Sequence, residues 1–362
     1  MNASARVVAL RGQFEEDGPT AFVITDPVNI AYLTGFEGVF DGEDAHVVVV
    51  TRETTVIYTD MRYAEALSRA AADTSWEVVA VRENLYITMC AELTAAGIGS
   101  IALETSAPHG RFRFISREFR GNVEAIDQWV EEIRQVKDDE EIHRIEAAQE
   151  LTDRAFDYIL DHVRPGAAER DVALELEFFM RREGSEGVAF APIVASGPNS
   201  ALPHAKVTGR AIETGDFVKL DFGARVDGYC ADMTRTVVVG CASDRQREIH
   251  RVVLAANLAG IEAVRGGVQG SSIDAAARAV IDSAGFGEQF GHGLGHGVGM
   301  EVHELPSVSA RGTKSVRVGS VITIEPGVYV PGFGGVRIED LVVVEHNGSR
   351  VLTRSPKDLI EL

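Results

Sequence analysis

Short apolar runs separated by amphipathic stretches fill the first third of the chain. Apolar runs of roughly four to eight residues favour β-strands, and longer stretches with apolar positions three or four apart favour helices. The expected strands are residues 21–25, 46–50, 55–58, 76–81 and 100–103, and the expected helices are residues 61–72 and 85–96. Strands that alternate with helices along the chain predict an α/β domain.

The pattern changes at Asp127, where a long charged segment with a helical period begins and continues to Arg164-Pro165-Gly166. Further helices are expected at residues 171–182, 244–264 and 273–284, between apolar runs that favour antiparallel strands. A chain of 362 residues is too long for one ordinary core. We therefore expect two domains, residues 1–127 and 128–362, the second with an α+β fold in which helices back antiparallel β-ribbons.

Two acidic side chains interrupt the apolar pattern of residues 217–239. This segment is typical of two strands around Asp227-Gly228, a dipeptide suited to a tight hairpin turn. A turn centred there pairs Asp221 with Thr234 and makes Asp232 a diagonal neighbour on the same face. Diagonal neighbours lie roughly 7 to 8 Å apart at Cα. Both carboxylates can therefore reach one metal centre.

A second ribbon repeats this arrangement. Apolar strands flank a loop at residues 331–335, and folding the chain about that loop sets Glu325 and Glu339 nearly opposite each other. An acidic side chain in an apolar strand is costly unless it is paired or bound to a metal ion. Each acid alone could be a solvent-exposed edge residue or a partner of Arg337. Four acids placed alike on two ribbons favour a pair of divalent cations, which need several anions around them.

A glycine-rich segment supplies the imidazole that such a site uses. Residues 290–306 contain His292, His296 and His303. The spacing of the first two would suit a helical zinc motif, but the glycines around them disfavour a helix and the motif's second histidine is missing after His303. We expect backbone packed beside a cleft, with one histidine as a metal ligand and two for proton transfer or substrate contact. An ordinary hydrogen-bonded role is the alternative for each.

Composition and charge disfavour some classes of binding partner and location. The chain has 55 acidic and 35 basic side chains and a net charge of -20, which disfavours nucleic acid or an anionic membrane as a partner. No stretch is apolar over the roughly 18 residues of a membrane span, and the first residues lack a secretory signal, so a cytoplasmic location is expected. Three cysteines without a CxxC pair disfavour a disulfide framework: Cys90, Cys230 and Cys241.

Several motifs resemble those of one known family. DFGARVDGYCADMTRT, HGLGHGVGMEVHE, EPGVY and GGVRIED, which begin at residues 221, 292, 325 and 334, are similar in order and spacing to the motifs of the pita-bread metallopeptidases, in the prolidase and aminopeptidase P branch. NIAYLTGF and TDMRY, at residues 29–36 and 59–63, resemble that branch's amino-terminal domain. The resemblance implies a creatinase/prolidase-type domain at residues 1–127 and a pita-bread catalytic domain at residues 128–362. Ala31 stands where the branch commonly has an arginine, so no role of that arginine is carried over.

The resemblance also implies a ligand set. Asp232 and Glu339 would bridge two divalent ions in each subunit, Asp221 would bind one ion, and His296 and Glu325 the other. Ligand hardness favours manganese, with cobalt or zinc as alternatives. A hydroxide between the ions would attack a peptide carbonyl, and Glu325 would carry the proton of the attacking water to the leaving nitrogen.

The resemblance also implies roles for three histidines and an arginine. His204, His292 and His303 would stabilise the tetrahedral intermediate and hold an Xaa-Pro unit, and Arg337 would brace the metal carboxylates. The expected substrates are therefore proline-containing dipeptides or short peptides with a free amino terminus. The resemblance further implies a homodimer.

Two more residues carry alternatives. Arg311 would bind the carboxylate of a dipeptide unless it lies in an ordinary solvent loop, and Tyr329 would line the pocket unless it is core. An aminopeptidase of broader specificity is the alternative function on the same fold. A metal-free amidinohydrolase and a non-catalytic binding module are disfavoured, because all five metal ligands are present.

Overall fold

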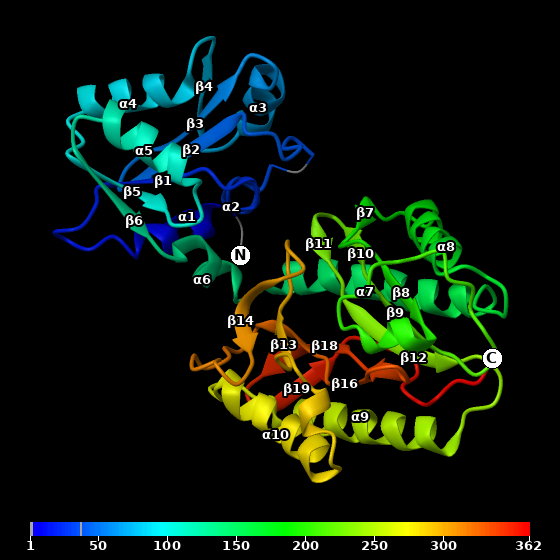
Figure 1. Ribbon diagram of the computed structural model, residues 1–362. Helices are drawn as coiled ribbons and strands as arrows, with labels where there is room; N and C mark the ends of the chain where they lie inside the picture. Colours follow the sequence, from blue (N-terminus) through cyan, green and yellow to red (C-terminus); the bar gives the residue numbers. More distant parts are fainter. Residues whose placement is uncertain (1–2, 37) are drawn as a thin grey trace. The chain divides into compact units, whose positions relative to one another are not determined.

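The computed structural model describes residues 3–36 and 38–362 (Figure 1). The chain forms two compact units, Met1–Arg134 and Gln135–Leu362, and the division falls a few residues after the change in composition at Asp127. Among the described residues, none of the helices is long and apolar enough to span a membrane.

The amino-terminal unit contains a six-stranded sheet in the order β4-β3-β2-β1-β5-β6. Strand β2 is antiparallel to its neighbours β1 and β3, and the other ladders are parallel. The strands are β1 (Ala21–Ile24), β2 (His46–Thr51), β3 (Thr55–Asp60), β4 (Glu77–Val81), β5 (Ser100–Glu104) and β6 (Asn122–Ile126). The helices are α1 (Ala3–Arg11), α2 (Pro27–Thr34), α3 (Ala64–Ala71), α4 (Leu85–Ala95), α5 (His109–Glu118) and α6 (Trp129–Arg134).

Side chains of β1 face opposite sides of this sheet. Ala21 and Val23 belong to the core that includes α4 and α5, whereas the ring of Phe22 lies 5.2 Å from that of Trp129 in α6. This alternation is the period of two that a strand buried on both faces shows. The expected strands and helices of this unit are present with bounds shifted by a few residues, and α1, α2, α5 and β6 add to them.

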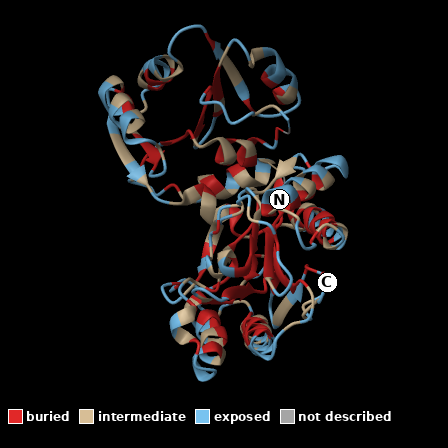
Figure 2. Cartoon of the chain, turned by 45° about the vertical axis from the view of Figure 1, so that its right-hand side comes forward, coloured by how far each residue is buried: buried red, intermediate tan, exposed pale blue. Residues whose placement is uncertain are grey.

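The carboxy-terminal unit consists of two β-ribbons, each backed by a pair of helices. Helices α7 (Asp139–Leu160) and α8 (Glu169–Arg182) share a core with the first ribbon, and α9 (Asp244–Ala263) and α10 (Gly270–Ser283) share one with the second. Figure 2 shows the buried residues concentrated in the strands of this unit. The α+β fold with helix-backed antiparallel ribbons is therefore confirmed.

The remaining elements of this unit are short. The first half contains β7 (Gly187–Val188), β8 (Ile193–Ser196), η1 (Gly197–Ala201), β9 (Phe217–Phe222), β10 (Ala224–Val226), β11 (Tyr229–Cys230) and β12 (Met233–Val238). The second half contains η2 (Gly287–Gln289), β13 (Gly295–Gly297), β14 (Glu304–Val308), β15 (Val321–Ile324), β16 (Gly327–Val330), β17 (Gly334–Arg337), β18 (Asp340–Glu345) and β19 (Gly348–Val351).

The first ribbon has the expected register. Its turn is centred on Asp227-Gly228, whose φ angles of 47° and 78° are both positive. Asp221 in β9 pairs with Thr234 in β12, as predicted. The hairpin dipeptide therefore fixes which side chains share the face of Asp221.

A break in this ribbon places Asp232. Gly223 separates β9 from β10, and Asp232 lies between β11 and β12 on the returning strand. A Cβ atom at Gly223 would lie only 1.8 Å from the carbonyl oxygen of Ala231. Glycine is thus required for the close approach that brings the Asp232 segment against β9.

The second ribbon also confirms its prediction. Strand β15 pairs with β18, and β16 pairs with β17, in one continuous register. Glu325 and Glu339 lie between these two ladders and stand opposite each other. The loop is shorter than expected, residues 331–333, because Gly334 and Gly335 already belong to β17.

Residues 290–306 contain no helix, as the unfavourable helix propensity of glycine predicted, and Gly295–Gly297 form the short strand β13. Strand β13 lies between β14 and β15 in a five-stranded sheet and carries His296. A Cβ atom at Gly295 would lie 2.0 Å from the carbonyl oxygen of Thr323 in β15. The glycines therefore permit close backbone packing beside the acidic side chains of the second ribbon.

Candidate metal centre

A cavity of about 340 Å³ opens in the carboxy-terminal unit, a size suited to a small ligand. Its polar lining includes all five expected metal ligands, the three expected substrate-contacting histidines and the expected bracing arginine, namely Asp221, Asp232, His296, Glu325, Glu339, His204, His292, His303 and Arg337. The rest of the wall is partly apolar, with Phe190, Ile193, Pro203 and Val302. Two ribbons, a glycine-rich strand and an irregular segment thus bring their polar side chains to one cavity.

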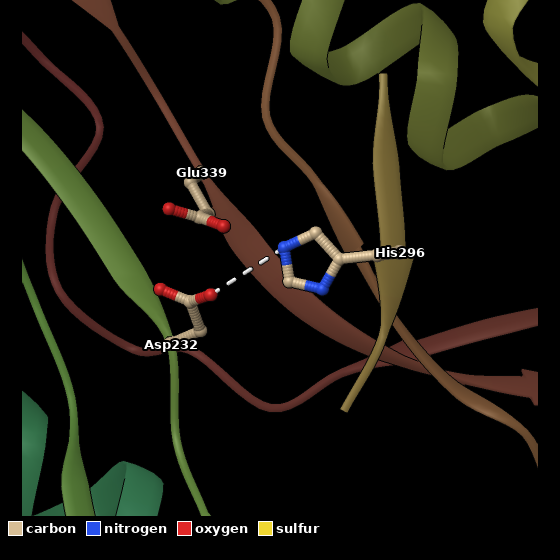
Figure 3. Close-up of side chains that lie close together, drawn as sticks. All are labelled: Asp232, His296 and Glu339. Atoms are coloured by element: carbon tan, nitrogen blue, oxygen red, sulfur yellow. Dashed lines mark ion pairs between the residues drawn. The ribbon is translucent and has the colours of Figure 1, made fainter. Parts of the chain in front are cut away.

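Three of the expected ligands form the tightest group. One potential ligand atom each from Asp232, His296 and Glu339 lies within 4.8 Å of the others. Figure 3 shows the two carboxylates and the imidazole turned toward one another from three strands or their ends. His296 Nε2 lies 3.6 Å from Asp232 Oδ2 and 3.3 Å from Glu325 Oε1. The arrangement is that of a metal site built from oxygen and nitrogen donors.

The imidazole of His296 is oriented for ligation. Its Nδ1 lies 3.1 Å from the carbonyl oxygen of Gly297, which only accepts a hydrogen bond, so Nδ1 carries a proton. Its backbone N–H donates to the hydroxyl of Thr323 at 3.1 Å. In the neutral ring, the lone pair of Nε2 therefore points at the carboxylates, which is how a backbone carbonyl fixes a metal-binding histidine.

The charges of the group require compensation. Burial and the charge of Glu339 raise the pKa of Asp232 well above its usual range, and burial and the charge of Glu325 do the same for Glu339. Burial also acts to raise the pKa of Glu325, but its hydrogen bond with His296 lowers it to about 2. Burial lowers the pKa of His296, and the same hydrogen bond outweighs this and raises it. Such a group retains protons unless cations replace them.

One atom shows directly that cations fit. The side chain of Glu339 is buried, and its Oε2 accepts a hydrogen bond from the hydroxyl of Thr234 at 2.7 Å. Its Oε1 is buried without a hydrogen-bond partner among the described residues. A buried carboxylate oxygen left unpaired is costly, and a divalent cation would satisfy it.

Arg337 braces the acids from behind. Its side chain is 4% exposed and forms an ion pair with Asp221 through Nη2. Its Nε donates to the hydroxyl of Thr234 at 2.9 Å, and its Nη1 donates to the hydroxyl of Tyr329 at 2.9 Å. Burial lowers the pKa of Arg337, and the neighbouring Tyr329 and acids outweigh this and raise it well above its usual range. The guanidinium therefore remains a fixed positive charge beside the carboxylates.

Tyr329 and Arg311 lie outside the cavity lining. Tyr329 is buried, and its hydroxyl lies 2.9 Å from Nε2 of His292, so it links that histidine to Arg337. Nδ1 of His292 lies 2.7 Å from the carbonyl oxygen of Gly293 and carries the proton, which leaves Nε2 to accept from the tyrosine. Arg311 is exposed in the turn that follows β14.

Charged side chains that sequence reasoning missed hold the histidine segments. Arg278 in α10 donates to the carbonyl oxygen of His292 at 2.8 Å, and its partner Asp274 accepts from the N–H of Leu294 at 3.0 Å. Lys137 forms a buried ion pair of 3.0 Å with Glu304, which follows His303. The spacing of four between Asp274 and Arg278 on an expected helix was the available signal, and it indicated only a local pair.

Comparison with known proteins agrees with this site. The family model of metallopeptidase family M24 matches residues 143–346, more than half of the chain, and that of the creatinase/prolidase N-terminal domain matches residues 6–136. The chain belongs to metallopeptidase family M24. It is a two-domain metallopeptidase with a pita-bread catalytic domain in the prolidase branch, and its family implies divalent metal ions.

Relatives of this M24 metallopeptidase cover at least 95% of its length. An uncharacterized peptidase of Bacillus subtilis, YqhT, is 40% identical over 98% of this chain and 99% of its own. The structure of an Xaa-Pro dipeptidase from Bacillus anthracis has a TM-score of 0.95 at 38% identity and covers 100% of both chains. That of an X-Pro aminopeptidase from Thermotoga maritima has a TM-score of 0.85 at 38% identity and covers 95% of this chain and 98% of its own.

Proposed function

We propose that the protein is a dinuclear metallopeptidase that hydrolyses the Xaa-Pro bond at the free amino terminus of dipeptides or short peptides. The observation that carries this proposal is the joint lining of one small cavity by five metal-ligand side chains and three further histidines. The similar proteins named Xaa-Pro dipeptidase and X-Pro aminopeptidase support the same bond.

The five ligands divide between two metal positions. Asp232 and Glu339 would serve both ions, Asp221 one of them, and His296 and Glu325 the other. A pair of divalent ions, manganese on ligand hardness, would supply Lewis acidity toward the peptide carbonyl and would activate a water as nucleophile at neutral pH. Arg337, paired with Asp221, would fix the direction of that carboxylate.

Glu325 is the proton carrier. Its carboxylate lines the cavity, where it could accept a proton from the attacking water. The nitrogen of an Xaa-Pro bond has no hydrogen, so it must gain one before it can leave. Glu325 would pass the proton to that nitrogen.

The histidines receive the substrate. His204 and His303 are exposed to the cavity and can donate hydrogen bonds to the carbonyl oxygen as it gains negative charge. His292 is fixed by Tyr329 and contributes the adjoining wall. Phe190, Ile193 and Val302 provide apolar surface for the proline ring or for the side chain before it.

Substrate choice tests the proposal. Protein stripped with a chelator and reconstituted separately with Mn²⁺, Co²⁺ and Zn²⁺ is given Met-Pro, Gly-Pro-Ala and Met-Gly-Ala at equal concentration, and initial rates are measured by liquid chromatography. We expect cleavage before proline in one or both proline peptides and little or none of Met-Gly-Ala. The ratio of the first two rates separates a dipeptidase from an aminopeptidase, and preference for Met-Gly-Ala would contradict the proposal.

A further inference from the structure

Lys219 is a fully buried lysine beside the metal centre. It lies on β9, on the same face as Asp221, and is 0% exposed. Its Nζ donates hydrogen bonds to the carbonyl oxygens of Leu202 at 2.6 Å and Pro203 at 3.1 Å. Burying an amine is costly unless it is hydrogen bonded, so the two carbonyls stabilise the buried amine and the amine in turn holds their backbone in place.

The two carbonyls immediately precede His204. The segment from η1 to residue 208 is held at its ends by Glu169, which accepts hydrogen bonds from Ser196, Asn199 and Thr208. In the middle, Leu202 is 56% exposed, whereas Ala205 is buried and Val207 packs against the core of the first ribbon. At residues 202 and 203, hydrogen bonds from Lys219 hold the backbone against β9.

Lys219 also lies over the ring of Tyr329, the residue that supports His292. Its Nζ lies 5.2 Å from the centre of the Tyr329 ring. The hydroxyl of that ring connects Arg337 to His292, and Nη1 of Arg337 donates to the carbonyl oxygen of Pro203 at 3.2 Å. Lys219 therefore lies between the backbone that precedes His204 and the Tyr329 ring, whose hydroxyl contacts His292.

We propose that Lys219 is a positioning residue that holds His204 at the cavity through the carbonyls of Leu202 and Pro203. Its effect on turnover rests on the proposed function of His204, whereas its effect on the order of the segment does not. A displacement of about 1 Å at a reacting group can cost on the order of a hundredfold in rate. Loss of these two hydrogen bonds should accordingly lower kcat more than it raises KM.

The first test measures order without turnover. Amide hydrogen exchange at residues 202–208 is followed by mass spectrometry in the metal-free wild type, Lys219→Met and Lys206→Met. Lys206 is an exposed lysine in the same segment, so its variant is the matched control. We expect exchange at least about tenfold faster in Lys219→Met and unchanged in the control. Equal protection in all three proteins would overturn the proposal.

The second test is a double-mutant cycle with Met-Pro and the manganese-loaded enzyme. We expect Lys219→Met to lower kcat/KM about tenfold to a hundredfold in the wild-type background and less than about twofold in His204→Ala, because both changes act on one group. Mn²⁺ affinity, measured by titration calorimetry, should stay within about twofold of the wild type. Effects that multiply, or a loss of metal affinity that accounts for the loss of rate, would overturn the positioning role.

A milder variant keeps both tests decisive. Lys219→Gln retains an N–H donor on a shorter side chain and should restore part of the protection and part of kcat. It replaces Lys219→Met in the comparison if that variant does not unfold cooperatively. If the wild type cleaves neither Met-Pro nor Gly-Pro-Ala, the proposed function fails, and the exchange measurement alone decides whether Lys219 holds the segment.

Discussion

Replacing Arg337 by methionine should destabilise the metal-free protein far more than the metal-loaded protein. The side chain of Arg337 is 4% exposed and pairs with that of Asp221, which is 8% exposed. Removing one partner of a buried ion pair typically costs about 3 to 5 kcal/mol, because the remaining charge stays buried. A bound divalent ion would compensate Asp221 in place of the arginine. We therefore expect a loss of about 3 to 5 kcal/mol without metal and a clearly smaller loss with Mn²⁺.

Urea unfolding of the carboxy-terminal unit, followed by circular dichroism with chelator and with saturating Mn²⁺, measures both losses. Arg350→Met is the matched control, since this arginine pairs with Glu146 and has a side chain that is 47% exposed. Exposed pairs contribute about 0 to 1 kcal/mol, with or without metal. Equal losses for the two variants, or a loss at Arg337 that is the same in both conditions, would refute the reasoning.

Three further changes have expected outcomes. Tyr329→Phe removes the hydroxyl that supports His292, so kcat for Met-Pro should fall several-fold with Mn²⁺ affinity unchanged, and an unaltered kcat would contradict this. Burial lowers the pKa of His250 from 6.5 to about 4, so the folded state binds fewer protons between these values. The contribution of neutral His250 to the free energy of unfolding is therefore fully present above pH 6.5, and about 3 kcal/mol of it is lost as the pH falls from 6.5 through 4. Urea unfolding of His250→Gln measured across this pH range should lack that loss. Gly223→Ala places a Cβ atom 1.8 Å from a backbone carbonyl, so dialysis against Mn²⁺ should show weakened binding, whereas wild-type affinity would argue against that contact.

The ribbons could be predicted from the sequence because local signals fix their register. Asp227-Gly228 sets the centre of the first hairpin, and a period of two then determines that Asp221 faces Thr234. In the second ribbon, apolar strands of matched length on both sides of a glycine-rich loop place Glu325 opposite Glu339. Ligands on strands inherit this regularity, which is why the acidic part of the centre follows from its pattern.

Contacts between distant segments could not be predicted in the same way. The bonds from Lys219 to the carbonyl oxygens of Leu202 and Pro203 join a strand to an irregular segment, and neither pattern nor composition encodes that meeting. Short elements were also missed. Helix α2 begins where Asp26 caps its first N–H groups, and a segment of that length carries too little periodicity to be distinguished from a loop.

The long helical segment expected after Asp127 is divided for a local reason. It forms α6 and α7 because Asp138 accepts a hydrogen bond from the N–H of Glu141, whose side chain accepts in return from the N–H of Asp138. This reciprocal capping box starts a new helix within a charged, helix-favouring stretch. The pattern of this acidic run predicts one continuous helix unless the spacing of Asp138 and Glu141 is taken as the start signal of a new helix.

Hydrolysis should require two divalent ions held by the five ligands. The test is to measure the number of Mn²⁺ ions bound per chain by equilibrium dialysis with elemental analysis. Met-Pro hydrolysis is followed on the same samples. We expect two ions per chain and full turnover in the wild type, and loss of both in Asp232→Asn. Turnover that survives exhaustive chelation, or saturation at a single ion with full activity, would contradict the account.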